Sequence, residues 1–321
     1  MGSIAVRIPV LPLSLKRTRR FELPRRISRE PRTIRSNNKD SFMAVIPLNT
    51  HDHQPIRLCR SEIVSITEIA WETFVLRLKE PALSQNAHPG QFVEIRVPRC
   101  ADILWRRPFS IHDADGEAET IDILFHAVGR GTEALKHLQV GDVLDLLGPL
   151  GNSFHIDDHL TEAIIVAGGL GIAPFKLFLR KTRQRNVPTT LFYGVGKKEQ
   201  LCRLDDFQPS AQVRVSSVDG SVGSRGMVTD LLIEHLRTVP DMERKCLFVC
   251  GPTPMLRKVQ EIAAQFQIKA QVSVETIMAC GFGVCVGCAV PMRFPDPGKK
   301  EYFLACKEGP VFNMEEIIIH D

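Results

Sequence analysis

The sequence has 321 residues, enough for two or three domains, and its 44% hydrophobic and 24% charged residues are ordinary for a soluble enzyme. The longest apolar runs, such as 163–167 and 247–250, are far too short to span a membrane. The net charge is +4, but residues 1–42 hold eleven lysines and arginines against three acids, which leaves about −4 for the rest. The short apolar runs exclude a membrane span. The negative net charge outside residues 1–42 argues against a nucleic-acid surface on the folded body.

The first 56 residues differ in composition from the remainder. They are rich in arginine and poor in acids, which superficially suits an organelle transit peptide, but they lack the apolar core of a secretory signal. We expect residues 1–56 to be a basic, disordered extension, with Met43 as an alternative start, because strand-like sequence begins only near Arg57. We expect the protein to be cytoplasmic.

Residues 57–156 read as short strands at close intervals, with turn residues between them. Hydrophobic and polar residues alternate in 73–79, 92–97 and 121–126. This pattern predicts a small antiparallel β-barrel. The turn-rich stretch 148–154 marks the end of this domain.

Two stretches of the barrel suit a phosphate-bearing cofactor. In Arg107-Pro108-Phe109-Ser110 a guanidinium could clamp a pyrophosphate and a hydroxyl could lie near a bound ring, although an Arg-Pro turn is also common structural material. In Gly129-Arg130-Gly131-Thr132 the glycines precede a predicted helix with Thr132 as its N-cap, where free N–H groups would face phosphate. The alternative for this second stretch is a plain capped helix.

A second domain, 157–268, opens with a strand, a glycine loop and a helix. The apolar strand 162–167 runs into Gly168-Gly169-Leu170-Gly171-Ile172-Ala173-Pro174, and a helix follows through about residue 185. The glycines permit close approach of a pyrophosphate, and Pro174 is tolerated in a first helical turn because its missing N–H costs nothing there. The loop departs from G-x-G-x-x-G, which puts the ordinary two-half Rossmann fold in doubt but leaves the reasons for phosphate binding intact, so we expect a parallel-sheet nucleotide-binding domain.

Further βα units follow this loop. Strands are predicted at 189–193, 213–218 and 246–250, with Thr229 capping a helix between the second and the third. Cys250 ends the last strand, at the edge of a parallel sheet that faces the ligand. Its thiol could face a nicotinamide, although a buried free cysteine is the commoner case.

The C-terminal residues 269–321 contain four cysteines in a metal-ligand pattern. Cys280, Cys285 and Cys288 have the C-x4-C-x2-C spacing that wraps a loop around a [2Fe-2S] cluster, and Cys306 would supply the distant fourth thiolate. Zinc is the alternative, but a zinc ribbon prefers two C-x2-C pairs and only one is present. Disulfides are disfavoured because nothing else in the chain indicates an oxidising compartment.

Together these motifs resemble the ferredoxin reductase superfamily. The motifs of that superfamily occur here in the order Arg107–Ser110, Gly129–Thr132, Gly168–Pro174 and Cys250–Pro252. With the cysteine motif added, the chain looks most like the electron-transfer subunits of NAD-dependent dihydroorotate dehydrogenases. The resemblance covers about residues 57–321. It implies a multi-domain fold with a FAD-binding antiparallel β-barrel, a NAD-binding α/β domain and a small C-terminal [2Fe-2S] domain.

The resemblance also implies a set of residues for each cofactor. FAD would be bound by Arg107, Pro108, Phe109, Ser110, Leu124, Phe125, His126, Gly131 and Thr132; NAD by Gly168, Gly169, Gly171, Ile172, Ala173, Pro174, Cys250 and Gly251; and the cluster by Cys280, Cys285, Cys288 and Cys306. NADP is an alternative to NAD, because Lys197 and Lys198 follow a strand where they could meet a 2′-phosphate, although exposed lysines there are usually just solvated.

A nicotinamide moves two electrons as hydride, whereas an iron–sulfur cluster moves one at a time, and flavin can convert between them without a catalytic acid. The resemblance therefore implies electron passage between an FMN-containing catalytic subunit and NAD during oxidation of dihydroorotate to orotate in pyrimidine biosynthesis, in a heterotetramer with two copies of each subunit. The alternatives are a related NAD(P)H-ferredoxin or sulfhydrogenase-type reductase subunit and a non-enzymatic, zinc-stabilised binding module. We expect no nucleic-acid or membrane partner.

Overall fold

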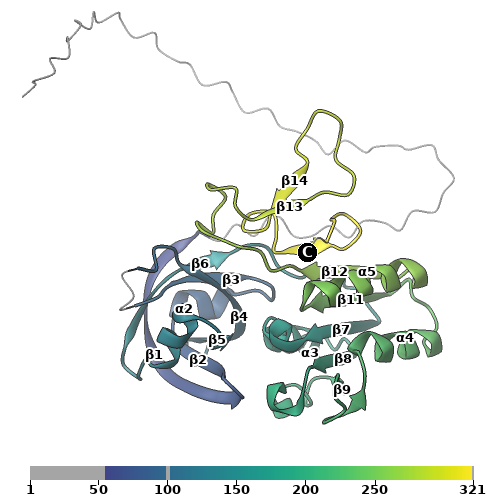
Figure 1. The fold of residues 1–321 in the computed structure, drawn as a ribbon, viewed down its shortest axis with the longest axis horizontal. Helices are drawn as coiled ribbons and strands as arrows, with labels where there is room; N and C mark the ends of the chain where they lie inside the picture. The colour runs from purple at the N-terminus through teal and green to yellow at the C-terminus, as the bar shows by residue number, and fades with distance from the viewer. Residues whose placement is uncertain (1–54, 99–101, 320–321) are drawn as a thin grey trace, which may run out of the picture. The chain divides into compact units, whose positions relative to one another are not determined.

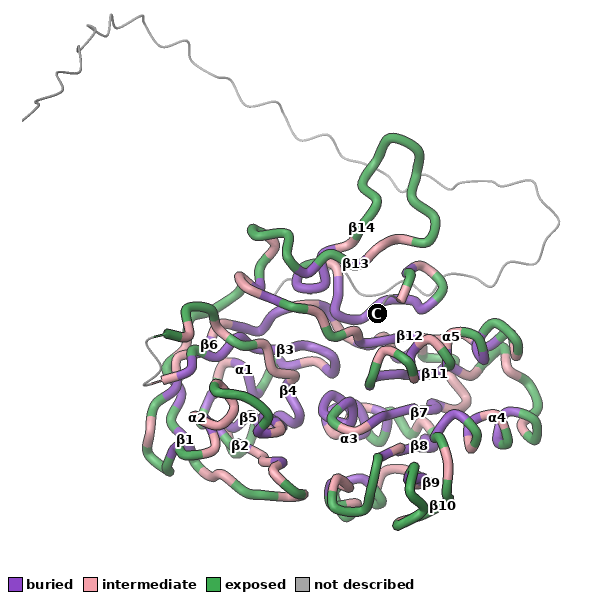
Figure 2. Tube along the Cα trace, in the orientation of Figure 1, coloured by how far each residue is buried: buried purple, intermediate pink, exposed green. Residues whose placement is uncertain are grey.

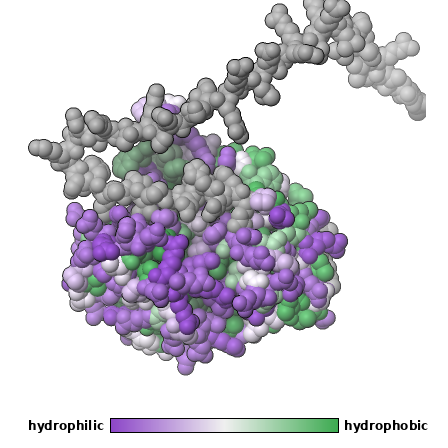
Figure 3. All heavy atoms as spheres, turned by 180° about the vertical axis from the view of Figure 1, so that it is seen from behind, coloured by the Kyte–Doolittle hydropathy of each residue, from purple (hydrophilic) through white to green (hydrophobic). Residues whose placement is uncertain are grey.

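The computed structural model describes residues 55–98 and 102–319 (Figure 1). Nearly all of the predicted basic extension, and the alternative start at Met43, lie outside these residues. Within them, no helix is both long and apolar enough to cross a membrane. The face seen in Figure 3 is largely hydrophilic, with its hydrophobic residues in separate patches.

The first part of the described chain is a closed antiparallel barrel of six strands in the order β1-β2-β5-β4-β3-β6. Alternation along the strands fills the barrel with fully buried aliphatic side chains such as Leu76, Ile95 and Ile123. The predicted barrel is therefore confirmed. Its elements are β1 (Arg57–Ala70), β2 (Thr73–Lys79), α1 (Pro81–Asn86), β3 (Phe92–Arg96), β4 (Arg107–Asp115), β5 (Thr120–His126), α2 (Arg130–Lys136) and β6 (Val143–Leu150).

The second part is a sheet of seven strands in the order β10-β9-β8-β7-β11-β12-β15. All neighbours pair in parallel except β12 and β15, which pair antiparallel. Helix α3 packs on one face of the sheet, and α4 and α5 pack on the other. The elements are β7 (Glu162–Gly168), a 3-10 turn (Gly169–Ile172), α3 (Phe175–Gln184), β8 (Thr189–Val195), two further 3-10 turns (Lys198–Gln200 and Leu204–Asp206), β9 (Gln212–Ser217), β10 (Ser224–Arg225), α4 (Val228–Thr238), β11 (Lys245–Cys250), α5 (Thr253–Phe266) and β12 (Lys269–Ser273).

The C-terminal segment combines a short hairpin with a strand added to the large sheet. The hairpin is formed by β13 (Ala289–Pro291) and β14 (Tyr302–Leu304), and β15 (Val311–Asn313) extends the sheet beyond β12. The loop between β13 and β14 is exposed (Figure 2). Cys288, Cys306 and Phe312 nevertheless share one hydrophobic core with Phe92 and Leu150 of the barrel, so this segment is packed onto the rest of the molecule.

Two predicted helix caps are wrong. Helix α2 begins at Arg130 with Gly129 at its N-cap, and α4 begins at Val228 with Met227 at its N-cap. In both helices the side chain three residues after the cap bonds the backbone: Thr132 Oγ1 accepts the N–H of Gly129 (3.2 Å), and Asp230 Oδ2 accepts that of Met227 (3.2 Å). These side chains bind the N–H of the N-cap residue itself, whereas an N-cap side chain binds the N–H of the second or third helical residue. Thr132 and Thr229 are of a residue type that N-caps prefer, but they lie three and two residues after the N-caps of α2 and α4.

A polar seam joins the barrel to the nucleotide sheet. The guanidinium of Arg180 on α3 donates to Asp113 on β4 (2.8 Å), and Lys176 lies 3.4 Å from Asp206 and 3.8 Å from Asp113. His112, which is 1% exposed, makes a 2.7 Å hydrogen bond from Nδ1 to the carbonyl oxygen of Ala173. The predicted glycine loop is therefore tied directly to the barrel.

The burial of His112 predicts a pH-dependent stability. Burial lowers the pKa of His112 from its ordinary value of 6.5, against the raising effect of the Ala173 bond. The unfolded chain therefore takes up a proton that the folded chain resists, and the free energy of unfolding falls as pH drops below about 6.5, by at most about 1.4 kcal/mol per pH unit for this one proton. Urea unfolding of His112→Asn, whose amide can still donate to Ala173, should depend less steeply on pH than the wild type. An unchanged slope would contradict this assignment.

Candidate functional site

Two loops meet at the carboxyl edge of the parallel sheet, where the strand order reverses. Strands β8 and β9 lie on one side of β7, and β11 and β12 lie on the other, so the loops after β7 and β11 adjoin at a topological switch point (Figure 1). A Cβ on Gly171 would overlap the carbonyl oxygen of Cys250 and lie 2.6 Å from the Cα of Gly251. Glycine at 171 therefore lets the two loops pack backbone against backbone.

A cavity of about 280 Å³, here called the junction cavity, lies between the barrel and this edge of the sheet. All three predicted domains contribute to its wall. The barrel supplies Phe92, Pro108, Phe109, Ser110, Leu124, Phe125, His126, Val128 and Thr132; the sheet supplies Leu170, Ala173, Pro174, Cys250 and Ser273; and the C-terminal segment supplies Val274, Glu275, Thr276, Met278 and Pro310. Most residues predicted to bind FAD thus converge with Ala173, Pro174 and Cys250 of the predicted NAD set.

Arg107 and Gly131 do not line the junction cavity. They lie beside each other, with the Cγ of Arg107 3.9 Å from where a Cβ on Gly131 would be. The guanidinium of Arg107 is exposed and makes a 3.5 Å contact with the carbonyl oxygen of Arg106. It therefore has room to bind an anion next to the start of α2.

The junction cavity contains polar groups that sequence reasoning missed. Thr276 Oγ1 is buried without a hydrogen-bond partner, and Glu275, an exposed residue, also lines the cavity. Burial, with a smaller contribution from Glu275, raises the pKa of the Cys250 thiol well above its usual range. An apolar cavity with an unpartnered hydroxyl and a neutral thiol fits a planar, polar-edged ring such as isoalloxazine.

A second cavity, of about 610 Å³, opens at the carboxyl ends of β7, β8 and β9 and is here called the sheet-edge cavity. Of the predicted NAD residues, Gly168 and Gly169 line it. Gly169 has φ +53°, and a Cβ there would meet no atom within 4 Å, so its backbone is open to a ligand. The other lining residues are Gly194, Val195, Gly196, Gln200, Ser216, Val218, Gly226, Met227, Val228, Thr229, Asp230, Pro252, Pro254, Met255 and Lys258.

Ser216 provides the sheet-edge cavity with a buried hydroxyl that has no partner within the protein. A dinucleotide carries ribose hydroxyls and phosphates that can satisfy such a group, so the residues present fit this ligand. Gly171, Ile172 and Gly251 line neither cavity, and Gly171 instead packs on β11.

The two lysines considered for a 2′-phosphate do not line the sheet-edge cavity. Lys197 Nζ lies 5.4 Å from the centre of the Trp71 ring, in a cation–π contact with the barrel. The backbone N–H of Lys198 donates to Ser221 (2.8 Å). Lys258 and Asp230 are the charged residues in the cavity wall.

The four cysteines of the C-terminal segment form two pairs. Cys288 and Cys306 lie 3.2 Å apart, sulfur to sulfur. The sulfur of Cys280 accepts hydrogen bonds from the backbone N–H of Val284 (3.3 Å) and of Cys285 (3.5 Å) and from the Cys285 thiol, and neither cysteine is in a disulfide. Within the described residues, no three His, Cys, Asp or Glu side chains converge on a single ion. Two pairs fit a cluster of two irons, each held by two thiolates, better than one tetrahedral zinc ion.

The loop prepares one sulfur for metal binding. Burial raises the pKa of Cys280, but hydrogen bonds from the backbone of Cys285 and Phe282 outweigh it and lower the pKa to about 6. Gly281 and Gly283 have φ of +76° and +90°, and these left-handed turns help to aim the N–H groups at the sulfur. Burial and the bond from Cys288 raise the pKa of Cys306 to about 12. The loop geometry therefore favours the thiolate form of Cys280, which is the form of cysteine that binds metals.

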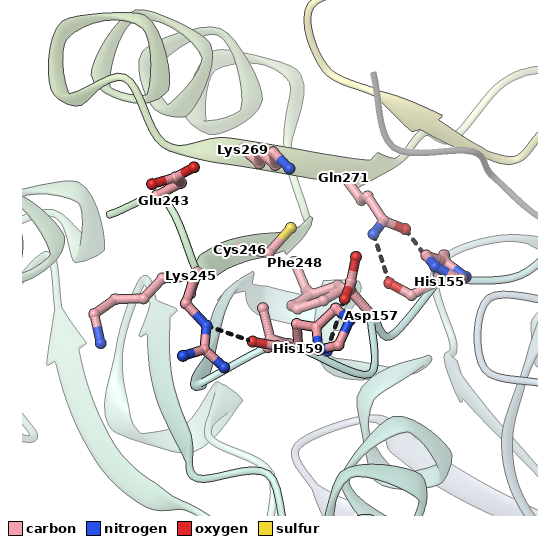
Figure 4. Close-up of a pocket in the computed structure, with 11 residues that line it drawn as sticks. His155, Asp157, His159, Glu243, Lys245, Cys246, Phe248, Lys269 and Gln271 are labelled. Atoms are coloured by element: carbon pink, nitrogen blue, oxygen red, sulfur yellow. Dashed lines mark hydrogen bonds between the residues drawn. The ribbon is translucent and has the colours of Figure 1, made fainter. Parts of the chain in front are cut away.

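A third cavity, of about 220 Å³, lies at the opposite, amino edge of the sheet (Figure 4). Lys269 and Cys246 line it, together with His155, His159 and Asp157 from the linker before β7. Its buried amide, Gln271, already bonds both backbone groups of His155 (2.7 and 2.8 Å). None of the predicted cofactor residues lies here.

Comparison with known proteins places each domain. An oxidoreductase FAD-binding domain matches residues 60–155, an oxidoreductase NAD-binding domain matches 165–261, and the iron-sulfur cluster binding domain of dihydroorotate dehydrogenase B matches 275–318. The fold and these domains define an oxidoreductase with FAD-, NAD- and iron–sulfur-binding parts in one chain.

Relatives named "Dihydroorotate dehydrogenase B (NAD(+)), electron transfer subunit" match most of the chain. That of Caldanaerobacter subterraneus is 35% identical over 81% of this chain and 98% of its own length, and that of Desulforamulus reducens is 31% identical over 80% and 97%. This chain belongs to the family of dihydroorotate dehydrogenase B (NAD(+)) electron transfer subunits.

Among solved structures, a chain from the NADH-dependent reduced ferredoxin-NADP oxidoreductase is 30% identical with a TM-score of 0.71, covering 81% of this chain and 90% of that one. An Amycolatopsis cytochrome P450 reductase, at 24% identity and a TM-score of 0.57 over 67% of each chain, shares the fold.

Proposed function

We propose that this chain passes electrons between a partner dehydrogenase subunit and NAD, in the oxidation of dihydroorotate to orotate. The observation that carries the proposal is the junction cavity, whose wall is built by the FAD-binding, NAD-binding and iron–sulfur-binding parts together. Electron transfer requires the cofactors of the three parts to lie close together, and a cavity walled by all three parts would bring them together.

In this proposal FAD lies in the junction cavity, NAD lies in the sheet-edge cavity, and the four cysteines hold a [2Fe-2S] cluster. When bound, the flavin would exchange hydride with nicotinamide and single electrons with the cluster. Phe109 and Phe125 would exclude water from the ring, and Thr276 Oγ1 would bond its polar edge. The thiol of Cys250, kept neutral by burial, would face the ring without adding charge.

Arg107 is proposed to clamp the flavin pyrophosphate beside Gly131 and Thr132. Arg107→Ala should therefore release FAD while the fold is kept, because a hydrogen bond to a charged group contributes about 1.5 to 3 kcal/mol, roughly a ten- to hundredfold loss of affinity. The flavin-to-protein ratio after gel filtration measures this. Arg60→Ala, at an exposed site on β1, is the matched control. Stoichiometric FAD in Arg107→Ala would assign Arg107 a structural role.

The proposed partner is an FMN-containing catalytic subunit, in a heterotetramer with two copies of each chain, and the proposed location is the cytoplasm. Support comes from the names of the relatives, which are electron transfer subunits. Co-expression of this chain with the catalytic subunit tests the proposal. The expected result is a complex containing flavin and iron that reduces NAD⁺ with dihydroorotate. A complex that binds both cofactors but gives no turnover with dihydroorotate would refute the substrate.

A second candidate is a reductase subunit that exchanges electrons with ferredoxin, because the ferredoxin-NADP oxidoreductase chain is 30% identical, close to the 30% and 31% of two curated relatives. The same purified protein decides between the two. Reduced ferredoxin would support NAD(P)⁺ reduction in this alternative, and dihydroorotate would not. A colourless protein containing zinc would instead support the non-enzymatic binding module.

A further inference from the structure

Glu94 of β3 is a fully buried carboxyl without a partner. Its side chain is 0% exposed, and neither Oε1 nor Oε2 has a hydrogen-bond partner. No other carboxylate in the described residues combines full burial with two unpartnered oxygens. Such a group is costly to bury, so its position calls for a reason beyond packing.

Strand β3 places Glu94 between the junction cavity and the cysteine loop. Its neighbours Val93 and Ile95 point into the barrel core, while Phe92, on the same face as Glu94, lines the junction cavity. Glu94 pairs across the sheet with Pro108, another residue of the cavity wall. It therefore adjoins the proposed flavin site.

The cysteine loop covers the other side of Glu94. A Cβ on Gly281 would lie 2.7 Å from the Cγ of Glu94 and 3.0 Å from Oε1, so the carboxyl touches the turn that directly follows Cys280. Gly281 has φ +76° and no side chain, which lets the turn lie against the carboxyl. The Glu94 side chain thus lies between the junction cavity and the cysteine loop, the two proposed redox sites.

The nearby cations do not neutralise this carboxyl by contact. Arg106 donates to the carboxylate of Asp145 (2.9 Å) and to its carbonyl oxygen (3.0 Å), and Arg107 is exposed. Burial raises the pKa of Glu94 to about 7 even though Arg106 and Arg107 oppose the rise, and Cys280 adds to it. A charge at Glu94 would therefore be felt by the cysteine loop with little screening.

We propose that the carboxylate of Glu94 lowers the reduction potential of the cluster. Its charge would thereby set the difference in potential that drives electrons between the flavin and the cluster. The proposal rests on the [2Fe-2S] assignment made above. A fixed negative charge in a dry seam opposes the arrival of an electron beside it, and local charge is one of the means by which a protein tunes such a cluster.

The test is a redox titration of the purified holoprotein, followed by electron paramagnetic resonance and carried out at alkaline pH, which favours the carboxylate form of Glu94. Glu94→Gln keeps the shape of the side chain and removes the charge, and Glu94→Leu removes the polar group altogether. Both variants should show a higher midpoint potential of the cluster than the wild type. Glu117→Gln, which removes an exposed carboxylate in the turn between β4 and β5, should match the wild type.

A wild-type potential in Glu94→Gln would overturn the proposal, whether or not Glu94→Leu shows a shift, because it would assign Glu94 to packing. The proposed function fails in a different way, namely if the wild-type protein holds no iron and gives no signal to titrate. Thermal unfolding of the metal-free chain is an additional check. Glu94→Leu should be at least as stable as the wild type, since it replaces an unpartnered buried carboxyl by an apolar side chain.

Discussion

Replacement of Cys285 by serine is expected to abolish electron flow between this chain and its partner subunit while NADH-dependent reduction of a dye that accepts directly from flavin persists. Serine is a poor ligand for iron because its hydroxyl is harder and less acidic than a thiol. Serine keeps the backbone N–H that residue 285 donates toward the Cys280 sulfur (3.5 Å), but it removes the Cys285 thiol that also hydrogen-bonds that sulfur. The pair formed by Cys280 and Cys285 therefore loses one of its two sulfur ligands. The FAD- and NAD-binding domains lie outside the cysteine loop and should keep their cofactors.

The comparison that isolates this effect is Cys59→Ser, which removes a thiol on β1, outside the cysteine loop. Iron content, the visible spectrum and both activities should be unchanged in that control. In Cys285→Ser, iron and partner-coupled turnover should fall together. If a Cys285→Ser protein shown to lack iron still gave normal partner-coupled turnover, the cysteine loop would have only a structural role and electrons would take another route.

The parts of the site encoded by local motifs could be predicted from the sequence. Phe109 and Ser110 follow an Arg-Pro turn, and Ala173 and Pro174 end a glycine loop after an apolar strand, so composition and spacing pointed to each of them. They lie on one cavity because the barrel and the sheet meet there. The spacing of the cysteines likewise indicated a two-iron cluster before any geometry was known.

Other residues of the two cavities reach them only through long-range pairing. Thr276 follows β12, which joins the sheet through a register that sets Ser273 opposite Cys250. No local pattern in the sequence encodes that register, and a single threonine or serine in a loop carries no motif. Ser216, inside β9, was missed for the same reason. Glu94 lies in an alternating strand, and the alternation alone does not indicate that the cysteine loop covers this side chain.

Replacement of Gly171 by alanine is expected to be the most damaging single change in the glycine loop. The added Cβ would overlap the carbonyl oxygen of Cys250 and lie 2.6 Å from the Cα of Gly251, and backbone atoms cannot move aside as a flexible side chain can. The loops after β7 and β11 must then separate, at a cost of about 1 to 3 kcal/mol or more. Because both cavities border these loops, we expect the unfolding midpoint in urea to fall and kcat/KM for NADH with a dye acceptor to fall by about tenfold or more.

Two other glycines calibrate this result. In the protein without a ligand, the added Cβ of Gly169→Ala meets no atom within 4 Å, and the cost to stability is that of φ +53°, about 1 to 2 kcal/mol in an L-residue. Because Gly169 lines the sheet-edge cavity, the methyl group also takes space from the proposed nucleotide. Gly116→Ala, in the turn between β4 and β5, has an ordinary 3.6 Å contact with Gln85 and should leave stability and activity unchanged. The expected order of damage is therefore Gly171, then Gly169, then Gly116. If Gly171→Ala were as stable and as active as Gly116→Ala, the loops after β7 and β11 would not be packed backbone against backbone at Gly171.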